Sequence, residues 1–201
     1  MSDPLSETPP PRRSCGPRRS DETHRAVLDA AEALLAEKGP AGVTFEAVAR
    51  RAGAGKPTLY RWWPTRTALM LEVYRRHKDQ SLSRPDTGSL ARDLEILLTD
   101  LWRFWRDGPG GRAYAAIISE AQHDDRARAA LAGQLDDPEF PMTPILRRGV
   151  ERGEIADMRE GAVLREYIAA MNWFRLLTGR LDEADIPGLI AVLLAGRSHG
   201  A

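Results

Sequence analysis

Apolar residues recur every three or four positions along most of the chain, and no stretch shows a sustained alternation of period two. In residues 21–39, Val27, Ala31 and Leu34 follow this spacing, and Gly39 with Pro40 ends the run. Apolar side chains repeat with a period near 3.6 residues in a helix and of two in a strand. The sequence therefore predicts an all-α protein without a sheet, and its 42% hydrophobic residues suffice for a core.

Glycine, proline and capping residues divide this pattern into separate helices. The expected helical segments are residues 21–39, 43–53, 56–63, 65–79, 89–107, 112–122, 124–135, 142–155, 158–180 and 183–196. Thr44 and Thr65 stand where an N-cap side chain is expected. No segment repeats another.

Charge is balanced overall but not along the chain. Lys and Arg number 29, as do Asp and Glu, and residues 1–78 hold 14 basic and 9 acidic side chains. Residues 79–201 hold 15 basic and 20 acidic side chains, so the net charge changes from +5 to −5. This asymmetry indicates an anionic partner for the first part only.

Residues 1–19 are rich in Pro, Ser and Arg and show no periodicity, so we expect a disordered tail. It carries four arginines with no acid between them: Arg12, Arg13, Arg18 and Arg19. Such a tail is either solvated or lies along nucleic acid as an arm.

The sequence favours a cytoplasmic location. Cys15 is the single cysteine, so no internal disulfide can form. The N-terminus lacks the apolar stretch of a signal peptide, and the late run LIAVLLAG is too short to span a bilayer. We therefore expect no membrane partner.

The stretch AGAGKPTLYRWWPTR, residues 52–66, predicts a helix barely two turns long that ends before Pro64. About four residues with two glycines separate it from the preceding helix. This is the spacing of a helix-turn-helix, whose second helix enters the major groove of DNA. Leu59 and Trp63 are four residues apart and should face the core.

The same helical period turns the other side chains of the short helix outward. These are Lys56, Pro57, Thr58, Arg61 and Trp62. Lys and Arg can donate to guanine O6 and N7, and Thr and Pro can contact a thymine methyl. The hydroxyl of Tyr60 can donate to a phosphate, which the helix N-terminus also favours.

Three motifs extend this interpretation: AA..LL.E.G in the first helix, T...VA..AG in the second and TLY in the third. Arg66 and Leu69 follow at matching offsets. Together they make residues 23–74 resemble the N-terminal domain of the tetracycline-repressor (TetR) family. DTGSLARDLEILL, residues 86–98, is similar to the start of the regulatory domain in one branch of that family.

The resemblance implies an N-terminal three-helix DNA-binding domain at residues 20–66 and a larger helical ligand-binding and dimerisation domain at residues 67–201. The implied protein is a homodimeric transcriptional regulator of a double-stranded DNA operator, released or altered by a small-molecule effector. Because bound protein blocks polymerase, repression is the expected sign of control, with activation as the alternative. Phosphates would be held by Thr44, Tyr60 and Arg66, and the groove met by Lys56, Pro57, Thr58, Arg61 and Trp62.

Aromatic and polar residues of the later helices are candidates for an effector pocket, since such sites are mostly apolar with few polar groups. The candidates are Trp102, Trp105, Tyr114, Ile118, Glu120, His123, Phe140, Met142, Met171, Asn172 and Phe174. Ordinary core packing is the alternative for each.

The last two helices carry an apolar stripe wider than one core-facing side requires. A dimer interface explains the excess, with five expected members: Tyr167, Met171, Phe174, Leu189 and Leu193. The alternative is a central helix that is buried on all sides.

No catalytic or metal-binding pattern stands out. His24, His77, His123 and His199 have no Cys, Asp or Glu at ligand spacing, and no phosphate loop or nucleophile elbow occurs. We expect no enzyme activity, metal or cofactor. Two rival functions remain open: a helix-turn-helix regulator without an effector, and a helical enzyme or carrier that has lost DNA binding.

Overall fold

A computed structural model of the chain describes residues 17–135, 137 and 140–195, and these residues form helices and no strand. The α-helices are α1 Pro17–Lys38, α2 Phe45–Ala52, α3 Lys56–Trp62, α4 Arg66–Ser81, α5 Leu90–Asp107, α6 Gly110–Ala121, α7 Asp125–Leu135, α8 Met142–Glu151, α9 Met158–Leu177 and α10 Ile186–Ala195. Two 3-10 turns, η1 Pro40–Gly42 and η2 Glu183–Asp185, lie between them. The all-α prediction is confirmed.

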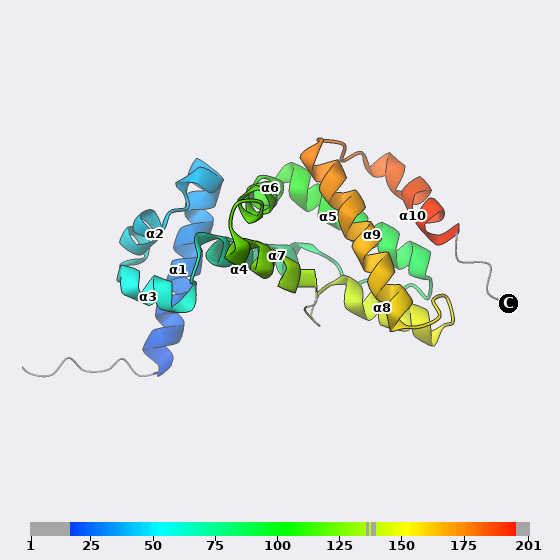
Figure 1. The fold of residues 1–201 in the computed structure, drawn as a ribbon, viewed down its shortest axis with the longest axis horizontal. Helices are drawn as coiled ribbons and strands as arrows, with labels where there is room; N and C mark the ends of the chain where they lie inside the picture. Colours follow the sequence, from blue (N-terminus) through cyan, green and yellow to red (C-terminus); the bar gives the residue numbers. More distant parts are fainter. Residues whose placement is uncertain (1–16, 136, 138–139, 196–201) are drawn as a thin grey trace, which may run out of the picture.

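The helices form two groups joined by α4 (Figure 1). Helices α1, α2 and α3 make one end of the molecule, and α5, α8, α9 and α10 make the other. Helix α4 packs against α1 and also against α5, α6 and α7. It is therefore the element that connects the short helix α3 to the interior of the larger group.

Local signals at the helix-turn-helix act as the sequence predicts. The hydroxyls of Thr44 and Thr65 accept hydrogen bonds from the backbone N–H of Ala47 and Ala68, each at 3.1 Å. Gly53 ends α2 at a φ of 63°, a left-handed conformation that glycine adopts without strain. Helices α2 and α4 thus begin at their threonine caps, and α2 ends at Gly53.

The core continues through both groups of helices. Leu59 is 0% and Trp63 2% exposed, as their spacing predicts. Trp63 also donates its indole N–H to Glu72 of α4 at 2.6 Å. This contact ties the end of α3 to the helix that follows it.

Some boundaries differ from expectation. Helix α1 begins at Pro17, within the segment expected as tail, because a proline in the first turn has no N–H that needs a partner. Helix α8 ends at Glu151, and Gly153, with a φ of 73°, turns the chain so that Ile155 is buried. The rest of the expected disordered tail, with Arg12 and Arg13, lies outside the described residues, as does His199.

Candidate nucleic-acid interface and internal cavity

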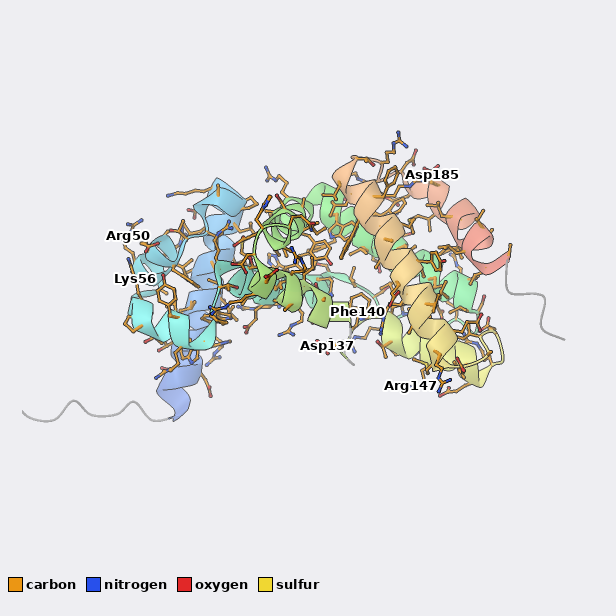
Figure 2. All side chains as sticks on the ribbon, viewed as in Figure 1. Arg50, Lys56, Asp137, Phe140, Arg147 and Asp185 are labelled. Carbon is orange, nitrogen blue, oxygen red and sulfur yellow. The ribbon has the colours of Figure 1, made fainter. Side chains whose placement is uncertain are left out.

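The outer face of α3 is exposed and basic. Lys56, Pro57 and Arg61 are exposed, Thr58 is half-buried, and Leu59 between them faces the core. Figure 2 shows Lys56 near the end of the molecule farthest from α8, α9 and α10. The nitrogen of Lys56 lies 2.7 Å from Glu46 of α2, and this ion pair is about half exposed. The hydrogen bond from Lys56 lowers the pKa of Glu46, so that carboxylate stays charged and orients the amine.

Tyr60 and Thr44 border this face. Tyr60 is 53% exposed and its ring meets Phe45 edge-on at 4.7 Å between centroids. Thr44 is exposed while its hydroxyl caps α2. Both residues therefore lie where they could contact a backbone phosphate beside α3.

Two expected contact residues are placed differently. Trp62 is half-buried, with its ring 5.3 Å from His24 and 5.6 Å from Trp63 between centroids. Its indole packs against α1 because the apolar ring gains more from that contact than from water. This packing leaves Trp62 less available to a groove than the exposed residues of α3.

Arg66 is the second residue that is placed differently. Its guanidinium donates to the carbonyls of Val43 and Pro40 at 2.7 and 2.5 Å and pairs with Glu120 at 2.7 Å. These contacts occupy Nε, Nη1 and Nη2 inside the protein. Arg66 thus joins the helix-turn-helix to α6 in this structure. Its partner Glu120, an expected pocket residue, does not line the cavity described below.

Sequence reasoning missed Arg50, an exposed residue of α2 that lies near Lys56 in Figure 2. Its neighbour Arg51 is paired with Glu37 at 2.6 Å. The signal was present, since Arg50 stands opposite the stripe of Phe45, Val48 and Ala49 on α2. Arg50 widens the basic surface beside α3.

An internal cavity lies among α4, α5, α6, α7, α8 and α9. Its lining is Tyr74, Lys78, Leu82, Leu97, Leu98, Leu101, Trp105, Tyr114, Gln134, Phe140, Pro141, Met142, Ala169, Asn172 and Trp173. The atom-free space, including the part open to solvent, is about 520 Å³, of which the centre of a water molecule can reach about 50 Å³. Figure 2 shows Phe140 between α7 and α8.

Some predicted pocket residues reach this cavity and others do not. Trp105, Tyr114, Phe140, Met142 and Asn172 line it. The other predicted members lie elsewhere and are corrected: Trp102, Ile118, Glu120, His123, Met171 and Phe174. Trp102 and Ile118 belong to the buried core, whereas His123 and Phe174 are exposed.

Two cavity residues of α4, Tyr74 and Lys78, were not predicted. They are four residues apart, and the pattern Leu69, Val73, His77 drew attention to the neighbouring side of that helix. Lys78 is only 4% exposed, and burial lowers its pKa to about 8. Burial also raises the pKa of Tyr74 and of Tyr114, so both phenols remain protonated.

Helices α9 and α10 leave large apolar side chains uncovered. The exposed fractions are 52% for Val163, 64% for Tyr167, 53% for Phe174, 55% for Leu177 and 77% for Val192. Of the five expected interface residues, Tyr167 and Phe174 belong to this exposed face. Met171, Leu189 and Leu193 are half-buried against the core.

Other classes of site have little support in the structure. Within residues 17–135, 137 and 140–195, no three His, Cys, Asp or Glu side chains gather as metal ligands would. No helix in the described part of the chain has the length and apolar character needed to cross a bilayer.

An exposed basic helix that follows α2 across a tight glycine turn defines the class of helix-turn-helix DNA-binding proteins. Comparison with known families agrees. Residues 27–73 match the model of bacterial regulatory proteins of the tetR family, and residues 84–193 match the tetracyclin repressor-like C-terminal domain.

Individual relatives cover most of the chain. The uncharacterized HTH-type transcriptional regulator YdeS of Bacillus subtilis is 30% identical over 81% of this chain and 82% of its own. The DNA-binding transcriptional repressor TetR of Mycobacteroides abscessus is 31% identical over 86% and 92%. The crystal structure of the TetR family transcription regulator SCO0332 is similar with a TM-score of 0.74 and 33% identity, covering 87% of this chain and 98% of that one. The chain belongs to the TetR family of transcriptional regulators.

Proposed function

We propose that this protein is a repressor that binds a near-palindromic DNA operator as a homodimer and releases it when a small molecule enters the internal cavity. The observation that carries the proposal is the course of α4. This helix starts directly after α3, and its residues Tyr74 and Lys78 line the cavity. A ligand that shifts α4 would also shift α3, because Trp63 is bonded to Glu72 of α4.

The proposed division is a DNA-binding part, α1–α3, and a regulatory part, α4–α10. In the DNA-binding part, Lys56, Pro57, Thr58 and Arg61 would meet the groove, and Thr44, Tyr60 and Arg50 would contact phosphates. Each is exposed or half-buried on one side of the helix-turn-helix. The proposed location is the cytoplasm, where the proposed operator DNA would be bound.

The proposed dimer forms through the exposed apolar face of α9 and α10. Tyr167 and Phe174 are seven residues apart, so they lie on the same side of α9 and can pack against their copies in a second chain. A two-fold axis through this face would make the contact self-complementary. It would also present two copies of α3 to two half-sites of an operator.

Two alternatives are less well supported. A regulator without an effector would not need a cavity that holds a buried amine, yet Lys78 lies in one. A helical enzyme or carrier would need a reactive group in the cavity and would have no use for the exposed basic face of α3. The names of the relatives, all regulators, also favour the proposed function.

The test is a footprint of the purified protein on its own upstream DNA. We expect protection of a near-palindrome whose two half-sites have their centres about 34–36 Å apart, which is one turn of DNA, or a multiple of that distance. The affinity should fall steeply with salt because several phosphates are neutralised. Protection of a single asymmetric half-site by a monomer, or an affinity independent of salt, would refute the proposal.

A further inference from the structure

The cavity wall offers hydrogen-bond donors but no carboxylate. Of its described lining residues, Lys78 is the charged one, and no Asp or Glu takes part. The nearby charges that act on Lys78, Arg75, Asp79 and Asp137, lie outside the lining. A buried amine is costly when the described opposite charges near it lie outside its cavity, so its retention points to a function.

Aromatic rings partly compensate this amine. Its nitrogen lies 5.7 Å from the ring centroid of Tyr74 and 5.0 Å from that of Phe140, both within cation–π range. Ring faces leave the three N–H donors without a directed acceptor. An anion that enters the cavity could supply one.

Two phenols add further donors beside Lys78. The Tyr74 oxygen accepts the indole N–H of Trp105 at 2.9 Å, and the Tyr114 oxygen accepts that of Trp173 at 3.3 Å. Each phenol oxygen therefore already accepts one hydrogen bond. Among the described residues, no acceptor is paired with the O–H of either phenol. Both O–H groups are available to donate to a ligand.

The same wall presents flat rings. Tyr74 and Tyr114 stack with centroids 4.5 Å apart and planes at 11°, and Trp105 stacks on Tyr114 at 5.7 Å and 19°. Leu97, Leu98 and Leu101 of α5 supply aliphatic surface beside them. A planar apolar body would be in contact with rings or methyl groups on several sides.

We propose that the cavity binds an organic anion with a planar apolar body, such as an aromatic carboxylate, whose charged group pairs with Lys78 and accepts hydrogen bonds from Tyr74 and Tyr114. The inference rests on the proposed function, since it assigns a ligand class to the proposed effector site. Without a ligand, the cavity has room for only a few water molecules. We therefore expect the cavity to widen when the ligand binds. Met142, an unbranched lining side chain, can adapt to a ring.

The experiment compares 2-naphthoate with the neutral 2-naphthamide of nearly equal shape by isothermal titration calorimetry. We expect the acid to bind wild-type protein on the order of tenfold more tightly, since a charge-assisted hydrogen bond contributes that much. Lys78→Met keeps the length of the side chain and removes its charge, so it should abolish the preference while amide binding persists. Arg76→Gln is the matched control, because it removes an equal charge from α4 at a residue that pairs with Asp29 and does not line the cavity.

Equal binding of acid and amide, or a preference that survives Lys78→Met, overturns the assignment of an anion. Absence of binding by both compounds at millimolar concentration also overturns it. Operator binding is measured on the same preparations without ligand. If the wild-type protein does not bind the operator, the proposed function is contradicted. If it binds the operator but does not prefer the acid to the amide, only this inference is contradicted.

Discussion

The outer face of α3 and the cavity wall on α4 use charge in opposite ways. Around α3, the cations Lys56 and Arg61 are exposed, and the partner of Lys56, Glu46, is exposed as well. In the cavity, Lys78 is 4% exposed and lies within cation–π range of the rings of Tyr74 and Phe140. An exposed charge costs little and can serve a large polyanion, whereas a buried charge costs stability and can serve only a ligand that enters the interior. The location of each cation thus indicates the size of its partner.

The largest effect is expected at the exposed apolar face of α9. Tyr167→Glu should leave the isolated chain folded, because Tyr167 is 64% exposed, but should separate a dimer that buries it. An unpaired buried charge costs about 3–5 kcal/mol, and the change occurs in both chains. Light scattering should show a monomer, and operator affinity should fall.

The control for Tyr167 is Glu166→Gln, a neighbouring exposed position that lies off the apolar stripe. It should leave the dimer intact. If Tyr167→Glu remains dimeric at micromolar concentration, the interface lies elsewhere and the exposed face of α9 has another role.

The next prediction concerns folding stability, which should depend on pH through the buried Lys78 but not through exposed lysines. The pKa of Lys78 is about 8 in the folded chain and near its usual 10.5 when unfolded. Between these values the unfolded chain binds more protons, so folding stability attributable to Lys78 rises with pH across that window. At pH 7 the charged Lys78 amine therefore lowers the free energy of unfolding by on the order of 3 kcal/mol.

Lys78→Met should therefore stabilise the protein at pH 7, and the gain should shrink as the pH approaches 10.5. Denaturant unfolding at several pH values measures it. Lys56→Met, at an exposed position, should show no such pH-dependent gain. A Lys78→Met variant less stable than wild type at pH 7 would contradict the idea that this amine is retained for binding.

Smaller effects are expected for single changes on the outer face of α3. Lys56→Ala and Arg61→Ala should each weaken binding to the specific operator by about 1–3 kcal/mol if they contact bases, with little change on unrelated DNA. Arg66→Ala should instead lower the free energy of unfolding, because it removes the bonds to Val43, Pro40 and Glu120. Fluorescence anisotropy and urea unfolding on the same variants separate the two outcomes. Normal operator affinity in both Lys56→Ala and Arg61→Ala would remove α3 from base recognition.

The smallest expected effect concerns the N-cap of α3. Gly55 has extended backbone angles and makes no side-chain cap, and an added Cβ would lie 3.7 Å from Pro57, an ordinary contact. Gly55→Ser should stabilise the fold by a few tenths of a kcal/mol by capping α3. Gly53→Ser should destabilise it, because Gly53 has a φ of 63°. Thermal unfolding compares the two, and a Gly55→Ser variant less stable than wild type would contradict the capping argument.

Local chemistry accounts for what could be predicted from the sequence. Thr44, Thr65 and Gly53 determine where helices start or stop through contacts within four residues. The four-residue spacing of Leu59 and Trp63 determines which side of α3 is buried. These rules suffice for an all-helical chain with a helix-turn-helix and for the exposed side of α3.

Tertiary structure decided the remainder, because periodicity identifies the side of a helix but not the element that covers it. Trp62 flanks the core stripe of α3, and α1 extends far enough to pack His24 against its ring. Arg66 is basic like Arg61, but only the approach of α6 gives its guanidinium the carboxylate of Glu120. Lys78 reads as a surface residue of α4 in the sequence, and it becomes a cavity residue because α5 and α6, distant in the chain, enclose that side of the helix.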